Sequence, residues 1–422
     1  MSSEPVATVE RHASWKELFF DLVVVAGIGQ LAHLLHDDMG STTLGLYAVL
    51  YLAFWISWAG FAVYGNVAGE GAKTRVLITA MLGLAVMAAS VPGIHGARAS
   101  AFVIAYVALR WYAGAVIARG KVLLDWPLAQ FGLGALPWLI SLWIDAPARY
   151  WLWGVGIVID LAVLLTSSGE HAMQEAEERL ERVKASRRRG GPAAGMLTIE
   201  GTPVEEEHLA ERLGLFVIIV LGEGLIQIID AAAEASTWDR STAVVSLGAF
   251  ALLASVWTAG LLHGTAGVPQ LTPHLVAPRI VMLLHAFLTG ALAALAAALG
   301  VAVAHTHGAL AFDARTLLCG AVAAYCLIGV VTAHLVGKGR RWLLVRGAPS
   351  VVVPVVLLLL APQLSVGALV WLLVLVVVWL ALEPPAEGRS PRRSRRRGRS
   401  ALAGASHQDD PRPERGHDAE HG

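Results

Sequence analysis

The sequence consists of apolar blocks of about twenty residues, separated by shorter polar connections. An α-helix rises about 1.5 Å per residue, so a helical block of this length matches the ~30 Å hydrocarbon core of a bilayer. Only 15% of the residues are charged and 56% are hydrophobic, a balance that a soluble domain of this size would not have. The sequence therefore predicts an all-α, polytopic membrane protein, whose first partner is the lipid bilayer.

About twelve membrane-spanning helices are predicted, six in each half of the chain. The first half gives spans at 17–36, 44–64, 75–94, 99–118, 126–144 and 150–168. The second half gives spans at 209–230, 241–263, 278–303, 314–336, 347–363 and 365–382. The fifth and eleventh are the weakest patterns, because they contain Pro137 and Pro354.

The distribution of Lys and Arg predicts the orientation, since basic residues favour the cytoplasmic side of a membrane. With an even number of spans, both termini are cytoplasmic and the protein is a multi-pass protein of the plasma membrane. The predicted inner segments, apart from the loop at 169–208, carry Arg11, Lys16, Lys73, Arg75, Arg119, Lys121, Arg279, Lys338, Arg340, Arg341 and Arg346. The predicted outer connections carry only Arg98, Arg149, Arg240 and Arg315.

These patterns divide the chain into five parts. They are an N-terminal cytoplasmic segment (1–16), a first six-helix region (17–168), a charged cytoplasmic loop (169–208), a second six-helix region (209–382) and a tail (383–422). The tail contains "RSPRRSRRRGRS" and is too polar to pack a core, so we expect it to be disordered. Its arginines favour contact with anionic lipids, and no nucleic-acid partner is expected.

The two six-helix regions begin with similar segments, "KELFFDLVVVAGIGQLAHLL" and "AERLGLFVIIVLGEGLIQII". Aligned without gaps, Glu17 matches Glu211 and His33 matches Gln227. Six helices per copy is an even number, so both copies would face the same way as two parallel repeats. We therefore expect the first and seventh helices to lie against each other near the centre of the protein.

The stretches "ELFFDLVVVAGIGQL", "HLAERLGLFVIIVLGEGLI" and "YVALR" (106–110) resemble the bacterial low temperature requirement protein A (LtrA) family. The resemblance covers roughly residues 11–382 and excludes the tail. It implies a bacterial membrane protein with many spans. It implies no reaction and no substrate, because the family is named for a growth phenotype in the cold.

Several polar side chains fall within the predicted spans, where a charged residue costs ~2.5–3.5 kcal/mol. At 100° per residue, Glu223 and Gln227 share one helical face with Arg212, and Glu223 lies ~18 Å from the cytoplasmic end. Gln30 and His33 form a similar face on the first helix. These residues are the candidates for a transport or proton site: Glu223, Gln227, His33 and Gln30.

A second set of charged residues is predicted to form gates or ion pairs. Glu17 and Asp21 lie near the cytoplasmic end, where arginines such as Arg75 could neutralise them. Glu211 and Arg212 are likewise expected to be gate-like or structural, paired with Arg279 and Asp21 or with their neighbours. The complete set is Glu17, Asp21, Arg75, Glu211, Arg212, Arg279, Arg110 and Asp160, of which Arg110 and Asp160 could pair with each other.

Three functions remain open at the level of sequence. The first is a proton- or ion-linked secondary transporter of an unknown ion or small molecule, which the repeat and the carboxyl group of Glu223 favour. The second is an intramembrane enzyme that acts on a lipid-linked substrate. The third is a sensor or structural membrane protein. No soluble-enzyme motif is found, so no catalytic, metal or cofactor residues are predicted, and Cys319 and Cys326 are expected to be buried small side chains.

Overall fold

The computed structural model describes residues 12–37, 39–117, 121–123, 132–166, 200–202, 204–262, 276–360 and 362–382. Within these residues, ten helices are long and apolar enough to cross a membrane. The prediction of an all-α polytopic membrane protein is therefore confirmed. The described helices belong to one compact unit, which ends at Ala381.

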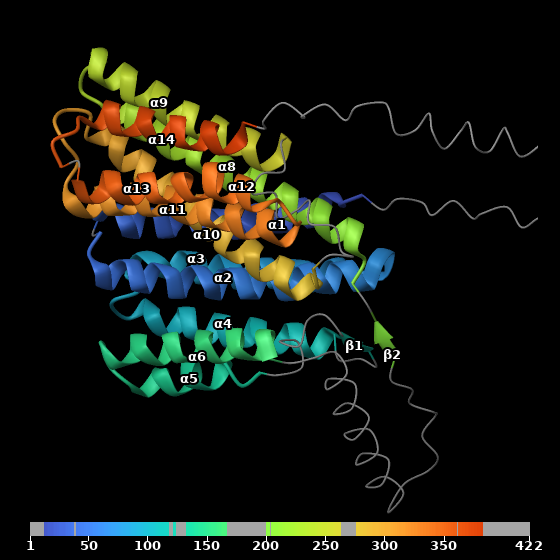
Figure 1. Cartoon of the computed structure of the whole chain (residues 1–422). Coiled ribbons are helices and arrows are strands. Elements are labelled where there is room, and N and C mark those ends of the chain that lie inside the picture. Colours follow the sequence, from blue (N-terminus) through green and yellow to red (C-terminus); the bar gives the residue numbers. More distant parts are fainter. Residues whose placement is uncertain are drawn as a thin grey trace, which may run out of the picture. The chain divides into compact units, whose positions relative to one another are not determined.

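Helices account for nearly all of the described chain (Figure 1). The first half contains α1 (Trp15–Asp37), α2 (Ser41–Ala68), α3 (Thr74–Ser90), α4 (Arg98–Ile117), α5 (Ala135–Ile140) and α6 (Ala148–Thr166). The second half contains α8 (Glu206–Glu234), α9 (Arg240–Trp257), α10 (Pro278–Ala304), α11 (Phe312–Leu335), α12 (Arg340–Trp342), α13 (Ala348–Leu360) and α14 (Val366–Ala381). A π-helical turn, Leu343–Gly347, joins α12 to α13, so that the two form one apolar span.

Two predicted segments differ from the structure. The described part of the span predicted at 126–144 contains only the six residues of α5 and one 3-10 turn, Ser141–Trp143, and residues 124–131 lie outside the described residues. The chain also forms two three-residue strands, β1 (Lys121–Leu123) and β2 (Glu200–Thr202), which pair in parallel. The remainder of the 169–208 loop before 200, and the tail from 383, lie outside the described residues.

Local sequence explains where several helices begin and end. Asp239 caps α9, because its carboxylate accepts a hydrogen bond of 2.9 Å from the backbone N–H of Thr242. Pro278 occupies the first turn of α10, where a missing N–H costs no hydrogen bond. Gly69 ends α2 with φ of 56°, a left-handed conformation that glycine adopts without strain.

The helices pack in the same order in the two halves. In the first half α1 contacts α2 and α3, α3 contacts α4, and α5 contacts α6; in the second half α8 contacts α9 and α10, α10 contacts α11, and α13 contacts α14. The halves meet where α1 and α2 contact α8 and α10. The first and seventh spans, α1 and α8, thus lie against each other as expected.

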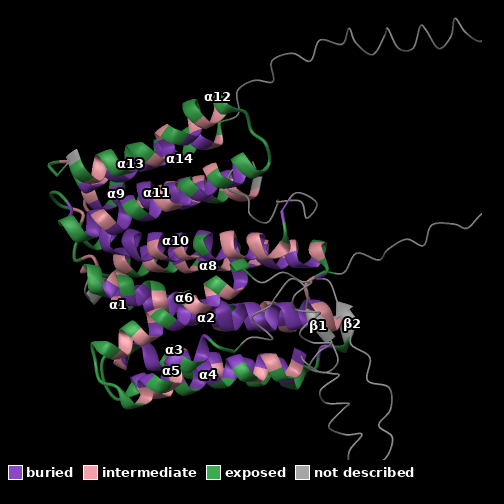
Figure 2. Cartoon of the chain, turned by 60° about the horizontal axis from the view of Figure 1, so that its bottom comes forward, coloured by how far each residue is buried: buried purple, intermediate pink, exposed green. Residues whose placement is uncertain are grey.

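The centre of the protein, however, is formed by other helices. Figure 2 shows α2 as an almost continuous buried helix and α13 as largely exposed, and α10 is as deeply buried as α2. The two buried helices contact each other through Tyr51, whose hydroxyl bonds to Thr289 at 2.6 Å and to the carbonyl of Ala286 at 3.0 Å. The boundary between the halves is therefore organised around α2 and α10, with α1 and α8 beside them.

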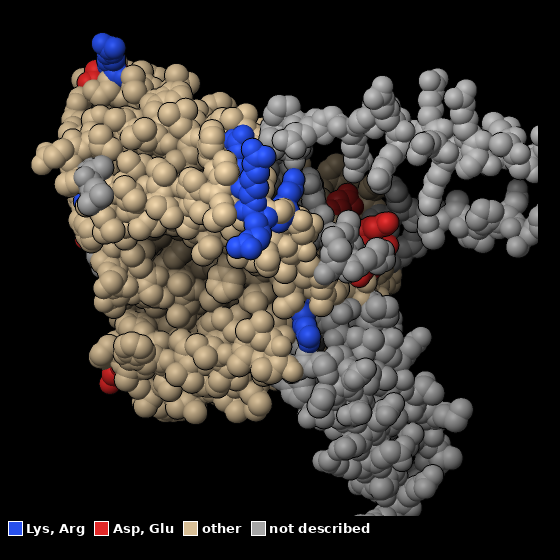
Figure 3. Space-filling model, in the orientation of Figure 1, with Lys and Arg blue, Asp and Glu red and all other residues tan. Residues whose placement is uncertain are grey.

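Charged side chains are concentrated at the ends of the helices. Figure 3 shows a basic patch near α12, where Lys338, Arg340, Arg341 and Arg346 occur, and a wall with hardly any charge between the two ends of the helices. Large apolar side chains such as Leu82 (66% exposed) and Val158 (65% exposed) lie on the outer surface of the helices. Such a surface is suited to contact with lipid.

Candidate functional site

A buried cluster of charges lies between α1 and α8. Arg212 of α8 donates to Asp21 of α1 at 2.5 Å, and its second terminal nitrogen lies 3.9 Å from a carboxylate oxygen of Glu17. The same oxygen lies 3.3 Å from Nε2 of His208, while the other oxygen of Glu17 accepts from the backbone N–H and hydroxyl of Ser14. All four charged or titratable side chains of this cluster are 3% exposed or less.

The spacing of these residues explains why they meet. Glu17 and Asp21 are four apart on α1, and His208 and Arg212 are four apart on α8, so each pair lies on one face of its helix. Glu17 contacts His208, and Asp21 contacts Arg212, so the two pairs meet in the same order along the chain. Such a pattern requires that α1 and α8 run in the same direction, which fits parallel repeats.

Aromatic residues of α2 and α10 close the cluster from the other side. The indole N–H of Trp58 donates to Asp21 at 2.7 Å, and the Arg212 guanidinium carbon lies 5.9 Å from the centre of the Trp58 ring. His285 stacks on Trp58 at 5.5 Å and accepts the indole N–H of Trp55 at 3.2 Å. The paired charges are thus enclosed by aromatic rings, in a setting where an unpaired charge would be very costly.

The cluster still contains unused hydrogen-bonding capacity. Oδ2 of Asp21 and Nε of Arg212 are both buried and have no hydrogen-bond partner among the described residues. Buried polar atoms are nearly always bonded, so an acceptor and a donor left over in one cluster call for an explanation. They are the remaining oxygen and nitrogen of two groups that already bond to each other through Oδ1 of Asp21 and a terminal nitrogen of Arg212.

A second polar site lies deeper along α8, at Glu223. Its carboxylate accepts a hydrogen bond of 2.9 Å from the side chain of Gln227, one turn further on. It also lies directly against Gly29 of α1, because a Cβ at that glycine would be only 2.6 Å from Oε1. Gln227 in turn lies beside Gly300 of α10. Glu223 is half-buried, and no described ion pair joins it to a cation.

The two predicted partners on α1 do not bond to Glu223. Gln30 is half-buried and His33 is exposed, and neither makes a hydrogen bond to Glu223 within the described part of the chain. The two polar faces predicted from helical periodicity therefore meet at a glycine of α1 rather than at its polar side chains. His33 instead lies on the outer surface of the protein.

A third site lies within the first half alone. Arg110 of α4 pairs with Asp160 of α6 at 2.8 Å, and the hydroxyl of Tyr106 donates to the other oxygen of Asp160 at 3.3 Å. Gly134, just before α5, leaves room for this carboxylate, since a Cβ there would lie 2.2 Å from Oδ1. The two residues thus pair with each other, and the contact ties α4 to α6.

The remaining candidates lie at the ends of helices. Glu211 lies 3.4 Å from the imidazole of His12 and accepts the backbone N–H of Ala13 at 3.1 Å. Arg279 is half-buried in the first turn of α10. Arg75 lines a cavity beside α4 and makes no described ion pair with Glu17 or Asp21. The expected pairing of these acids with Arg75 is wrong, because Arg212 takes that position.

Two members of the main cluster, His208 and Trp58, were not predicted as site residues. His208 precedes Arg212 by one helical turn, as Glu17 precedes Asp21, and this matched spacing is a signal that the sequence does contain. Within the described residues, no group of three or more His, Cys, Asp or Glu could hold a metal ion.

Comparison with known proteins agrees with the motifs of α1 and α8. Residues 12–382 match the family described as "Bacterial low temperature requirement A protein (LtrA)". The chain is also 29% identical over 234 residues to a Rhizobium meliloti (strain 1021) protein described as "Uncharacterized protein RA0937", a match that spans 52% of this chain and 51% of that relative. No solved structure matches the chain. Because the family match extends over nearly all of the described helices, this chain belongs to the bacterial low temperature requirement A family of membrane proteins.

Proposed function

We propose that the protein is a proton- or ion-linked secondary transporter and that Glu223 is its coupling group. The observation that carries this proposal is the environment of Glu223: a half-buried carboxylate in the middle of a membrane-length helix, bonded to Gln227 and close to no described cation. A carboxyl group inside a membrane-spanning helix that has no ion-pair partner offers a site where a proton or a cation can bind.

The position of Glu223 also supports the proposal. Its carboxylate lies against Gly29 of α1, so that Glu223 of the second half contacts the first half where α1 and α8 meet. Binding sites of repeat-containing transporters lie at such boundaries near the bilayer midplane. A movement of one half against the other would change the side of the membrane from which Glu223 is accessible to water and ions.

The cluster around Arg212 would have a different part in this mechanism. Its ion pair with Asp21 holds α1 and α8 together near one end of the two helices. This pair lies about 16 Å from Glu223 along α8. We infer that it acts as a fixed point or inner gate rather than as the titrating site, because the guanidinium already neutralises the carboxylate. The same enclosed pairing is the feature that best supports the alternative of a non-transporting membrane protein.

Reconstitution separates these alternatives. The full-length protein is placed in liposomes that contain a pH-sensitive dye, and proton movement is followed after gradients of Na⁺, K⁺ or a panel of small solutes are imposed. We expect Glu223→Gln to insert normally and to abolish coupled proton movement. The control, Asp230→Asn, changes an exposed acid two turns away on the same helix and should retain it.

An infrared measurement tests the coupling group without knowledge of the substrate. Binding of a proton at Glu223 should give the parent protein a carboxylic acid C=O band that is absent from Glu223→Gln and present in Asp230→Asn. Glu223→Ala should in addition lose ~1–3 kcal/mol of stability, since Gln227 is left without its partner. If Glu223→Gln moves protons like the parent while Glu223→Ala is merely less stable, the residue is structural and the proposal fails.

A further inference from the structure

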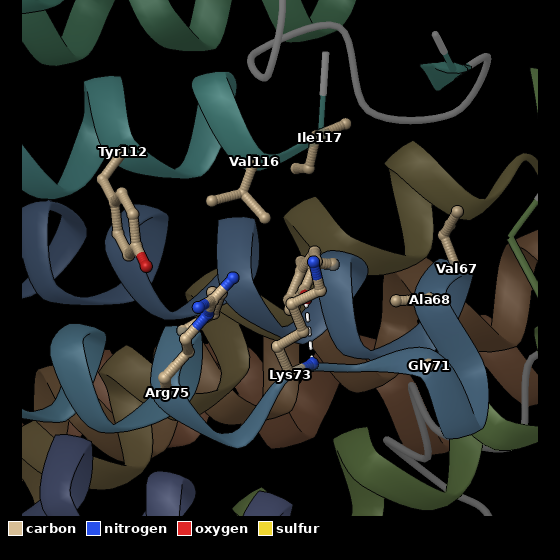
Figure 4. Close-up of a pocket in the computed structure, with 10 residues that line it drawn as sticks. Val67, Ala68, Gly71, Lys73, Arg75, Tyr112, Val116 and Ile117 are labelled. Carbon is tan, nitrogen blue, oxygen red and sulfur yellow. Dashed lines mark hydrogen bonds between the residues drawn. The ribbon is translucent and has the colours of Figure 1, made fainter. Parts of the chain in front are cut away.

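A cavity of about 550 Å³ lies between the end of α2, the start of α3 and the end of α4. Figure 4 shows Lys73 and Arg75 extending across it toward Tyr112 and Val116 of α4. Two cations and no acidic residue are found among its described lining residues. We propose that this cavity binds the phosphate headgroup of an anionic phospholipid.

The polar groups of the cavity suit a phosphate. Lys73 and Arg75 are two residues apart at the start of α3, and neither side chain has a described acidic partner. The hydroxyl of Tyr64 accepts the backbone N–H of Lys73 at 3.0 Å, which leaves its own O–H free to donate. The hydroxyl of Tyr112 also reaches the cavity, where it lies on the same side as Arg75 (Figure 4). Ammonium, guanidinium and hydroxyl donors are the groups that bind phosphate oxygens.

The apolar walls point to a lipid rather than to a soluble ester. Val67, Val76, Val116 and Ile117 complete the lining beside the polar groups. On the same face of α3 as Arg75, further along the helix, Ile78 (58% exposed) and Leu82 (66% exposed) form an outward apolar surface. A headgroup at Lys73 and Arg75 would therefore allow an acyl chain to lie along α3.

The location fits the same ligand. The cavity lies at the end of the helices where Lys16 also reaches the α2–α3 connection, with its ammonium 3.3 Å from the carbonyl of Ala72. By the distribution of Lys and Arg this is the predicted cytoplasmic end, and basic pockets between helices on that side of a membrane bind anionic headgroups. The proposal does not depend on whether the protein transports.

Lipid titration of the purified full-length protein in a neutral detergent tests this site. The probes are phosphatidylglycerol, zwitterionic phosphatidylcholine and soluble glycerol phosphate, and the readouts are bound lipid by native mass spectrometry and the thermal shift. Removal of both cations in Lys73→Gln/Arg75→Gln should weaken binding of phosphatidylglycerol by about tenfold or more. The control, Arg340→Gln/Arg341→Gln, removes two cations at the same end and should change it little.

A second variant tests the cavity itself. Val116→Trp fills the space and keeps both cations, so it should also reduce phosphatidylglycerol binding, and its unfolding temperature without lipid shows whether it folds. Equal binding of phosphatidylglycerol and phosphatidylcholine, or equal losses in the test and control double variants, would overturn the proposal. If glycerol phosphate binds in dependence on Lys73 and Arg75 while phosphatidylglycerol does not bind, the phosphate site stands and a lipid as its source is excluded.

Discussion

Replacement of Arg212 by Met is the sharpest test of how the two halves are held together. The guanidinium is fully buried and is the only described cation within 4.0 Å of Asp21; it also approaches Glu17 at 3.9 Å. Met has a similar length and is apolar, so the variant removes the charge without leaving a large cavity. Two carboxylates, each 3% exposed or less, would then remain in the protein without their guanidinium.

The expected cost follows from this burial. Removal of one partner of a buried ion pair typically costs ~3–5 kcal/mol, because the other charge stays buried and uncompensated. Asp21→Asn should cost less, about 1–2 kcal/mol, since Glu17 still lies 3.9 Å from the guanidinium and the amide oxygen can still accept the indole N–H of Trp58. In the double variant the uncompensated charge at position 21 is gone. We therefore expect Arg212→Met/Asp21→Asn to be more stable than the sum of the single losses predicts, by at least ~1 kcal/mol.

Equilibrium unfolding of the four proteins in mixed micelles, followed by tryptophan fluorescence, measures this cycle. Arg110→Met/Asp160→Asn and its single variants provide a matched comparison, because that pair lies within one half. Proximity measurements between labels on α1 and α8 should change for Arg212→Met and remain constant for Arg110→Met. A loss below ~1 kcal/mol for Arg212→Met, or strict additivity of the cycle, would refute the reasoning.

Three further predictions concern other parts of the chain. Gly134→Ala should lower the unfolding temperature and cost about 1–3 kcal/mol, because the new Cβ would overlap the carboxylate of Asp160. The hydrogen bond from the N–H of Thr242 lowers the pKa of Asp239 below its usual 3.8. The cap therefore stabilises the start of α9 above that pH, and this stabilisation is lost as the pH falls through the lowered pKa. Hydrogen exchange in this turn should increase on acidification in the parent and be independent of this titration in Asp239→Asn. Reporter fusions in the 169–208 loop and at the C-terminus should both report the cytosol, and a signal from the other side at either place would contradict the predicted orientation.

The helices could be predicted from sequence because bilayer thickness fixes their length. Ten of the predicted spans correspond to long apolar helices, and their ends follow local signals such as Asp239 and Pro278. The span at 126–144 failed because apolar content alone does not show where a helix stops. The pairing of β1 with β2 could not be predicted either, since three-residue strands are too short to show a periodicity.

The candidate site was predictable only in part. The sequence placed Asp21 and Arg212 among the candidate gate or ion-pair residues and raised the possibility that they pair, which they do. Periodicity gives the face of a helix but not the rotation of one helix against another. For this reason it could not show that Gly29, rather than His33, faces Glu223.

Asp21 on α1 and Glu223 on α8 have very different surroundings. Near the ends of the helices, Asp21 has a guanidinium, an indole N–H and a tightly packed aromatic surrounding, all of which fix one arrangement. Glu223 is bonded to the amide of Gln227 and lies against Gly29 of α1. Because glycine has no side chain, α1 can move past the carboxylate at this point without steric conflict. A protein that needed both acids only for packing would gain from pairing both with cations, because an isolated acid inside a membrane is costly. Among the described residues only Asp21 of these two acids has an ion-pair partner, which is consistent with the proposed division between a fixed contact and a coupling group.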